Sequence, residues 1–228
     1  MKHINKQLED ILKLNRRQVM NLQYVYKVLA RIYDLLDVIY FADYNKSPRK
    51  VVNNAIDKKD KVLDICTGTG TNAIRIAKNK PNAKVAGIDI SKDMLRIAKN
   101  KVEKEEIDNI KFYCMDASRL KFKDEMFDKI SIALVLHEME DDMAKKLIQE
   151  AKRVLKQNGQ IIVTEWEPER KAYKKLLFLP IHLLEPKTYR KFIQKDMKQY
   201  FEKFDLRIVE IVPCDYSKVI ILEKAKHF

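Results

Sequence analysis

Hydrophobic positions along the middle of the chain alternate between two periods. Short apolar runs, typical of buried strands, are followed by stretches in which apolar residues recur every three or four positions, typical of amphipathic helices. This alternation predicts a parallel sheet with helices on both faces. The predicted strands span 62–66, 84–90, 110–115, 129–135 and 160–165, and the predicted helices span 72–79, 92–105 and 141–156.

The two ends of the chain follow other patterns. Apolar positions in 4–41 keep helical spacing and predict one long or broken helix, and Ser47-Pro48 predicts the start of a short helix through residue 55. After a helix expected over 187–203, two closing strands at 206–212 and 216–223 are joined by a short link that predicts an antiparallel hairpin.

The fold class expected from these elements is α/β. It is a Rossmann-like, seven-stranded, mostly parallel sheet with a C-terminal antiparallel hairpin, helices on both faces and an N-terminal helical cap. We expect the cap to span residues 1–57 and the Rossmann-like part to span 58–228, within a single structural domain, which suits a chain of 228 residues.

Composition indicates a soluble globular protein, with 46% hydrophobic and 35% charged residues. No apolar run approaches the roughly 20 residues of a membrane span, and the start lacks a signal-peptide core. Three cysteines, Cys66, Cys114 and Cys214, have no metal-ligand spacing and suit a reducing compartment. We therefore expect a cytoplasmic protein without a bound metal. No signal for an oligomeric state is present.

The formal net charge of +13 invites a nucleic-acid or anionic-membrane partner. However, the excess of basic residues is spread as +5, +3 and +5 over residues 1–60, 61–165 and 166–228, and lysine supplies most of it. A solvated lysine-rich surface explains this distribution better than a phosphate-binding face. A nucleic-acid partner is therefore not favoured.

Two glycines stand between the first predicted strand and the next helix. Gly68 and Gly70 lie where the backbone turns tightly and can approach a ligand closely, which predicts a cofactor loop. The pattern Gly68-x-Gly70-x-x-Ala73 also fits a dinucleotide fingerprint, so it leaves an NAD-dependent oxidoreductase open. Asp64 would repel a pyrophosphate but can hold the cationic amino end of a methionine moiety. Together with the closing hairpin, Asp64 favours an amino-acid-bearing cofactor.

Acidic residues end the next two predicted strands. Asp89 lies 19 residues after Gly70, where a carboxylate can accept hydrogen bonds from both ribose hydroxyls of an adenosine. Its alternative role is to cap the following helix. Met94, one turn into that helix, is placed to pack on an adenine or in the core, and Asp116 could accept from the adenine amino group.

With these residues the chain resembles the class I S-adenosylmethionine (SAM)-dependent methyltransferases over about residues 60–166. The shared pattern comprises Val62-Leu-Asp64, Gly68-Thr-Gly70, Asp89, Asp116 and the turn Leu155-Lys-Gln-Asn-Gly159, whereas Cys66 stands where many members carry the first loop glycine. The resemblance implies SAM as the cofactor and acceptor pockets built from N-terminal helices and an inserted segment. The implied cofactor-binding residues are Tyr33, Asp64, Thr67, Gly68, Gly70, Asp89, Ile90, Met94, Asp116, Ala117 and Leu134.

Within this class the chain is most similar to the methyltransferases of ubiquinone and menaquinone biosynthesis. Those enzymes carry Leu-Arg-Asn after the fourth strand, whereas this chain carries Leu136-His137-Glu138-Met139, so the residues nearest the acceptor differ. His137 is the first candidate for a general base, with a capping or packing role as the alternative. Glu138 is the second candidate, because it could orient His137, although it could also simply begin the next helix.

The expected acceptor is small or lipid-like and is methylated at carbon, oxygen or nitrogen. The apolar stretch 176–184 could form a lid over it or a buried connection, and the N-terminal helix could touch a membrane surface or cap the site. A nucleic-acid methyltransferase remains an alternative, although an Asn/Asp-Pro-Pro-aromatic motif is missing after the fourth strand. A nonenzymatic SAM-binding regulatory protein is the other alternative.

Overall fold

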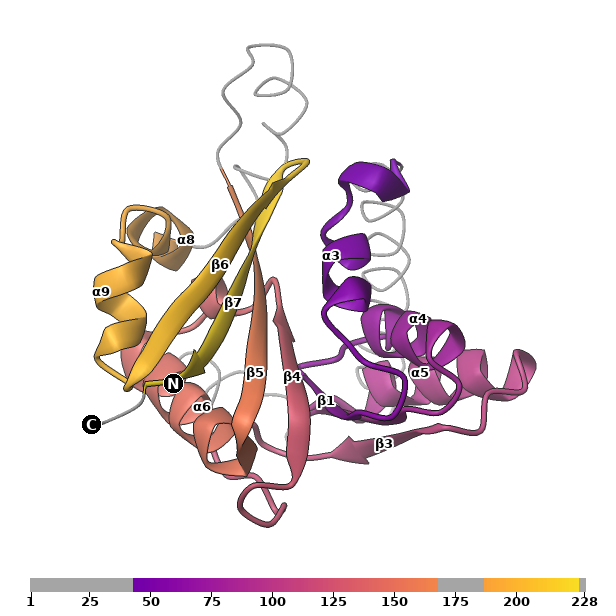
Figure 1. Ribbon diagram of the computed structural model, residues 1–228. Coiled ribbons are helices and arrows are strands. Elements are labelled where there is room, and N and C mark those ends of the chain that lie inside the picture. The colour runs from indigo at the N-terminus through magenta and orange to yellow at the C-terminus, as the bar shows by residue number, and fades with distance from the viewer. Residues whose placement is uncertain (1–42, 168–186, 226–228) are drawn as a thin grey trace, which may run out of the picture. The chain divides into compact units, whose positions relative to one another are not determined.

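The computed structural model describes residues 43–167 and 187–225, which form one seven-stranded sheet with helices on both faces (Figure 1). The strands are β1 (Lys61–Ile65), β2 (Lys84–Asp89), β3 (Ile110–Cys114), β4 (Phe127–Ala133), β5 (Leu155–Trp166), β6 (Leu206–Cys214) and β7 (Ser217–Lys224). This architecture confirms the predicted fold class. The predicted N-terminal helix with Tyr33 and the predicted lid over 176–184 lie outside the described residues.

The order of the strands across the sheet is β3-β2-β1-β4-β5-β7-β6. Strands β1 to β5 pair in parallel, and β7 pairs antiparallel with both β5 and β6. The closing hairpin is therefore present as predicted. Its link lies two residues later than expected, because β6 continues through Cys214 and the turn is made by Asp215 and Tyr216, with Tyr216 at a φ of 55°.

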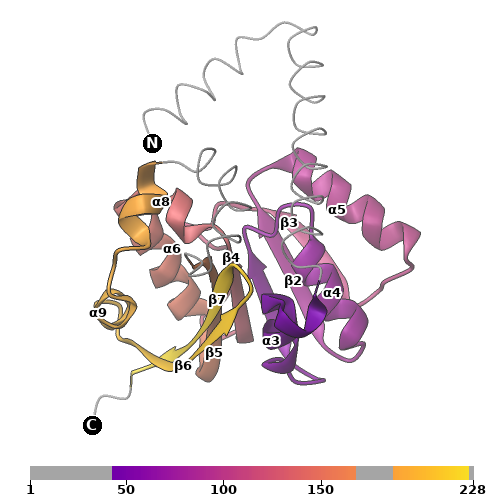
Figure 2. The ribbon, with the colours of Figure 1, turned by 90° about the horizontal axis from the view of Figure 1, so that it is seen from above.

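Helices connect the parallel strands and flank the sheet. They are α3 (Pro48–Asn54), α4 (Thr71–Asn79), α5 (Lys92–Lys104), α6 (Asp141–Val154), α8 (Lys187–Phe192) and α9 (Met197–Glu202), with short 3-10 turns η1 (Tyr44–Lys46) and η2 (Leu136–Glu138). Figure 2 shows α3, α4 and α5 on one side of the strands and α6, α8 and α9 on the other. None of the described helices is long and apolar enough to cross a membrane.

The alternation of side chains along each strand divides the core into two halves. Leu63 and Ile65 of β1 pack with apolar residues of α6, α8 and α9, whereas Val62 packs with those of α3, α4 and α5. The same alternation in β5 directs Ile161 and Val163 towards α6 and Ile162 towards the opposite face. Because both faces are covered, the strand residues are apolar on both sides.

The predicted helix start at Ser47-Pro48 is confirmed. Oγ of Ser47 accepts the backbone N–H of Arg49 at 3.2 Å and Pro48 occupies the first turn of α3. Val52 and Ile56 are buried in the same apolar cluster as β1 and β2. This part of the predicted N-terminal cap therefore packs into the core of the sheet.

The single helix predicted over 187–203 is wrong, because the structure has two helices there, α8 and α9. The side chain of Asp196 accepts the backbone N–H of Gln199 at 3.1 Å and starts α9 as its N-cap. The apolar periodicity continues across the break, since Phe192, Met197 and Phe201 are all buried against the sheet. Apolar periodicity alone therefore does not reveal the break between α8 and α9, which the N-cap Asp196 marks.

Candidate functional site

The predicted site residues gather where parallel strands end. Strands β3, β2, β1 and β4 are adjacent and parallel, so the loops that follow them meet at the carboxyl edge of the sheet. From these loops and strand ends come Asp64, Thr67, Gly68, Gly70, Asp89, Ile90, Asp116, Ala117, Leu134, His137 and Glu138. In an open α/β sheet this edge is the place where ligands bind.

The loop after β1 needs its glycines for two different reasons. Gly68 has a φ of 55° and Gly70 a φ of 78°, a left-handed region that favours glycine. A Cβ on Gly70 would lie 2.9 Å from both Ala98 Cβ and Phe112 Cζ, so this glycine lets α5 and β3 pack against the loop. Among the residues that the structure describes, a Cβ on Gly68 would meet nothing within 4 Å. Gly68 therefore faces open space, as a loop that admits a ligand requires.

Asp89 at the end of β2 connects the loop after β1 to β2. Its Oδ2 accepts the backbone N–H of Gly68 at 2.9 Å, and its Oδ1 accepts the N–H of Ser91 at 2.8 Å. A carboxylate offers about four acceptor positions, so one remains on each oxygen. The helix that follows is capped by Ser91, whose Oγ accepts the N–H of Met94 at 3.3 Å. The alternative capping role of Asp89 is therefore filled by its neighbour.

An apolar surface continues from Asp89. The side chain of Ile90 is 68% exposed although it is aliphatic, and Met94 is half-buried in the first turn of α5. After β3, the exposed Asp116 accepts the N–H of Ser118 at 2.8 Å and is followed by Ala117. These residues from two adjacent strand ends offer an apolar surface with carboxylates beside it, which suits an adenosine.

Asp64 differs from the other acids because it is buried, with 2% of its surface exposed. Its Oδ2 accepts the hydroxyl of Thr67 at 2.6 Å and its Oδ1 accepts Nδ2 of Asn72 at 3.0 Å. Burial raises the pKa of the Asp64 carboxyl above its ordinary value of 3.8, while these hydrogen bonds act in the opposite direction. Asp64 therefore anchors the loop from within.

Two polar residues beside Asp64, Asn72 and Ser131, were not predicted from the sequence. Nδ2 of Asn72 also donates to Oγ of Ser131 in β4 at 2.8 Å, and Ser131 is buried. This links the cofactor loop to β4 across 59 residues. Two sequence features could have indicated this link: the amide of Asn72 in the first turn after Gly70, and the single hydroxyl of Ser131 between apolar residues of β4.

The turn after β4 places the two candidate catalytic residues differently. His137 is buried, with 1% of its surface exposed, and its Nδ1 lies 2.5 Å from Oε2 of Glu165. Its ring meets that of Tyr189 edge-to-face at 5.6 Å. The side chain of Glu138 is 47% exposed, and its Oε1 lies 4.0 Å from Nε2 of His137. Glu138, rather than His137, presents its side chain at the surface of this edge.

Glu165 is a further polar residue that sequence reasoning missed. It is 1% exposed near the end of β5, and its Oε1 accepts the backbone N–H of Leu136 at 2.9 Å. The signal that could have found it is a carboxylate within the apolar run 161–166, because an acid is buried only where a partner neutralises or hydrogen-bonds it.

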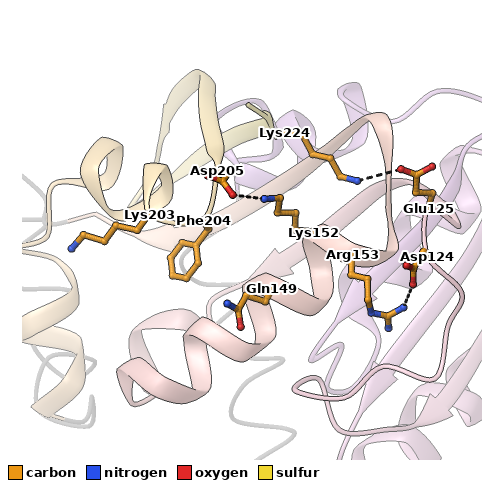
Figure 3. A pocket seen from close by; sticks show the side chains of 9 residues that line it. All are labelled: Asp124, Glu125, Gln149, Lys152, Arg153, Lys203, Phe204, Asp205 and Lys224. Atoms are coloured by element: carbon orange, nitrogen blue, oxygen red, sulfur yellow. Dashed lines mark hydrogen bonds and ion pairs between the residues drawn. The ribbon is translucent and has the colours of Figure 1, made fainter. Parts of the chain in front are cut away.

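A pocket of about 520 Å³ lies at the opposite, amino-terminal edge of the sheet (Figure 3). Six of the seven charged side chains that line it are joined in pairs, with Lys152 2.8 Å from Asp205, Arg153 2.5 Å from Asp124 and Lys224 3.8 Å from Glu125. Because these charges neutralise one another and the predicted site residues lie elsewhere, we assign no ligand to this pocket.

The carboxyl edge fits SAM. The free acceptor positions of Asp89 match two ribose hydroxyls, the exposed Ile90 offers an apolar contact for adenine, and the open space at Gly68 admits the methionine portion. When bound there, SAM supplies an electrophilic methyl group on a positively charged sulfur. Asp64, buried beneath the loop, supports this arrangement through Thr67 and Asn72.

The sheet order, the glycine loop and the acids at successive strand ends define a Rossmann-like methyltransferase domain, and comparison with known families agrees. A methyltransferase domain family matches residues 62–159. A demethylmenaquinone methyltransferase from Staphylococcus aureus is 31% identical over 192 residues, which cover 82% of this chain and 76% of that protein. The chain therefore belongs to the family of SAM-dependent methyltransferases that includes the demethylmenaquinone enzymes, and it is itself a SAM-dependent methyltransferase.

Solved structures share the fold. A SAM-dependent methyltransferase from Aquifex aeolicus has a TM-score of 0.63 at 21% identity, covering 77% of this chain and 88% of that chain. A putative SAM-dependent methyltransferase from Methanococcus maripaludis has a TM-score of 0.68 at 20% identity, covering 87% of this chain and 93% of that chain. At these identities the likeness concerns the fold of the domain.

Proposed function

We propose that the chain transfers the methyl group of SAM to a small, lipid-like acceptor of the quinone type, in its reduced, phenolic form. The observation that carries this proposal is the 31% identity to a demethylmenaquinone methyltransferase over 192 residues. That match is longer than the domain match over 62–159, so the likeness extends beyond the cofactor-binding part. In this class the acceptor pocket is built outside that part.

The chemistry of methyl transfer selects the reduced form of such an acceptor. The acceptor must supply an electron pair, and a quinone ring is electron-poor, whereas a phenolic ring carbon or oxygen is nucleophilic. In the transfer, a bond forms between that atom and the methyl carbon, the carbon–sulfur bond breaks, and its electron pair stays on sulfur. The acceptor loses one proton, which a base of the protein can take.

Glu138 is the proposed base. Its half-exposed carboxylate lies in the turn after β4, next to the loop of β1 in the sheet order. His137 is buried behind it, so an acceptor at this edge meets Glu138 before the imidazole. Tyr33, Thr67, Ala117 and Leu134 remain proposed cofactor contacts together with the acids and glycines of the same edge.

A transfer assay with methyl-labelled SAM tests the proposed acceptor. We expect label in the organic phase with a chemically reduced demethylmenaquinone analogue and none with its oxidised form. Phospholipid vesicles, transfer RNA and duplex DNA serve as competing acceptors. Label in nucleic acid would favour the nucleic-acid alternative, and transfer to phospholipid alone would replace the quinone-type acceptor. We expect Glu138→Gln to lower kcat by about 10²-fold or more, as for loss of a general base.

A further inference from the structure

A buried carboxylate ends the apolar part of β5. Because alternate residues of a strand point to the same face, the side chain of Glu165 lies on the same face of β5 as those of Ile161 and Val163. Ile161 and Val163 pack in the half of the core formed with α6, α8 and α9. The exposed fraction of Glu165 is 1%. An ionised carboxylate in such surroundings is costly unless partners satisfy it, so its contacts identify its role.

Both oxygens of Glu165 contact the same short turn. Oε2 lies 2.5 Å from Nδ1 of His137, and Oε1 accepts the backbone N–H of Leu136 at 2.9 Å. A carboxylate at this distance favours a proton on Nδ1 and stabilises the protonated imidazole. Glu165 therefore holds two residues of η2 by hydrogen bonds, although it lies 29 residues after Leu136 and 28 residues after His137.

The backbone before this turn is strained. Leu134 has a φ of 53°, a left-handed value that is unfavourable for a residue other than glycine. Its N–H donates to the backbone oxygen of Thr164 in β5 at 2.8 Å. Such a conformation persists only where the surroundings determine it. Here the hydrogen bonds with Thr164 and Glu165 of β5 hold the backbone of Leu134 and the turn after it in this conformation.

The contacts then continue outward to the surface. Nε2 of His137 lies 4.0 Å from Oε1 of Glu138, and the exposed fraction rises from 1% at His137 to 47% at the side chain of Glu138. A protonated imidazole at this distance attracts the carboxylate of Glu138. The orientation of the buried His137 ring therefore bears on the position of the exposed Glu138 carboxylate.

We infer that Glu165 is a positioning residue for methyl transfer: it holds the η2 turn and the imidazole of His137, which in turn keeps the Glu138 carboxylate in place to take the proton of the acceptor. This inference rests on the proposed function, in which Glu138 is the base. His137 accordingly acts through Glu138 and does not contact the acceptor.

Glu165→Gln tests the inference, because it keeps size and removes charge. The matched control is Glu167→Gln, the same change two residues away, where the carboxylate lies 3.9 Å from Lys218 and is 43% exposed. With the reduced demethylmenaquinone analogue, we expect kcat to fall at least tenfold in Glu165→Gln while the Kd for SAM stays within twofold. Both kcat and this Kd should be unchanged in Glu167→Gln. An unchanged kcat in a folded Glu165→Gln protein overturns the inference.

A second readout is independent of the acceptor. In protein labelled with ¹⁵N at histidine, the bond to Glu165 predicts a strongly deshielded Nδ1 proton of His137, present in Glu167→Gln and lost in Glu165→Gln. Absence of that proton from the wild-type spectrum overturns the inference even where no quinone is methylated. A reduced demethylmenaquinone analogue that is not methylated while the proton is present overturns the proposed acceptor instead.

A double variant covers the case in which Glu165→Gln does not fold. Glu165→Met with His137→Leu removes both buried partners and leaves no uncompensated charge, which proteins often tolerate. We expect this protein to fold and bind SAM, with kcat at least tenfold below that of the wild type. Wild-type kcat in the double variant contradicts the positioning role.

Discussion

The backbone N–H of Gly68 donates a hydrogen bond of 2.9 Å to Oδ2 of Asp89, 21 residues further along the chain. This bond joins the loop after β1 to the end of β2. The acid that suits the ribose thereby also fixes the glycine that faces the open space of the site. The two portions of the proposed cofactor site are thus coupled through one carboxylate.

The two loop glycines should respond differently to alanine. In Gly70→Ala the new Cβ lies 2.9 Å from Ala98 Cβ and Phe112 Cζ at a φ of 78°, so we expect the free energy of unfolding to fall by about 2–4 kcal/mol. In Gly68→Ala no described residue lies within 4 Å of the new Cβ, so we expect only the cost of backbone strain, about 1–2 kcal/mol.

The affinity for S-adenosylhomocysteine should be affected more in Gly68→Ala than in Gly70→Ala. The Cβ of Gly68→Ala projects into the space assigned to SAM, so we expect its affinity for S-adenosylhomocysteine to fall at least tenfold. Urea denaturation measures the stabilities, and calorimetry measures the affinity of each folded variant. Equal losses of stability in both variants would contradict the different surroundings of the two glycines.

Asp64→Asn tests the cost of the buried carboxylate. Because the pKa of Asp64 is raised in the folded state, its protonated form stabilises the fold fully below the ordinary value of 3.8, and this contribution is lost as the pH rises through the folded pKa. The amide keeps the shape without the charge. We expect the variant without ligand to melt higher than the wild type at neutral pH, with the difference vanishing towards pH 3.8.

The same variant should bind the cofactor more weakly, because its amide is a poorer acceptor for Thr67 and Asn72 and the loop loses its anchor. Melting curves from neutral to acid pH, with and without S-adenosylhomocysteine, measure both effects. A constant difference in melting temperature over this range would show that the charge of Asp64 does not cause it.

Arg153 on α6 should control the loop that follows β3. Its guanidinium donates to the backbone oxygens of Leu120 at 2.9 Å and Phe122 at 3.0 Å and pairs with Glu150 and Asp124 (Figure 3 shows the pair with Asp124). Lysine lacks this fork of donors, so we expect Arg153→Lys to lower the free energy of unfolding by about 1–2 kcal/mol. Affinity for S-adenosylhomocysteine should fall several-fold, because this loop begins at Asp116.

The neighbouring Lys152 gives the control for that change. It pairs with Asp205 at 2.8 Å, but the two side chains are 30% and 53% exposed. Since an exposed pair contributes little, Lys152→Met should change stability by less than about 1 kcal/mol and leave the affinity intact. Denaturation curves of the two variants distinguish the outcomes, and an equal effect would contradict a specific role of Arg153.

The three cysteines should differ in reactivity. Burial raises the pKa of the Cys66 thiol to about 12 and that of Cys214 to about 11, whereas Cys114 is exposed. The thiolate is the reactive form, so at pH 8 we expect one fast-reacting thiol, which Cys114→Ser removes. A chromogenic disulfide reagent measures the rates. Fast labelling of Cys66 in the folded protein would contradict the raised pKa of this half-buried thiol.

Sequence patterns predicted what depends on near neighbours along the chain. The Ser47-Pro48 helix start, the strand-end positions of Asp89 and Asp116 and the glycine loop all follow from local signals, and the parallel sheet follows from the alternation of periods. The contacts of Asn72 with Ser131 and of His137 with Glu165 join residues 59 and 28 positions apart. Such pairs depend on strand order and register, which periodicity does not specify.

His137 illustrates the difference. Its position after the fourth strand predicted a group at the carboxyl edge, and that is where η2 lies. The direction of its side chain is set by Glu165 and by Tyr189 of α8, neither of which is near it in the sequence. Sequence therefore located the turn, whereas the structure shows which of its side chains is exposed.

The most direct test of the central claim, a SAM site centred on Asp89, is the melting temperature with S-adenosylhomocysteine and with NAD. A ligand that binds only the folded state stabilises it by about 2.7 kcal/mol at a hundred times its Kd. Asp93→Ala is the matched control, since Asp93 lies in the first turn of α5 and pairs with Arg96 at 3.2 Å. We expect S-adenosylhomocysteine to raise the melting temperature of the wild type and of Asp93→Ala but not of Asp89→Ala. Stabilisation by NAD alone, or an undiminished shift in Asp89→Ala, would contradict the assignment.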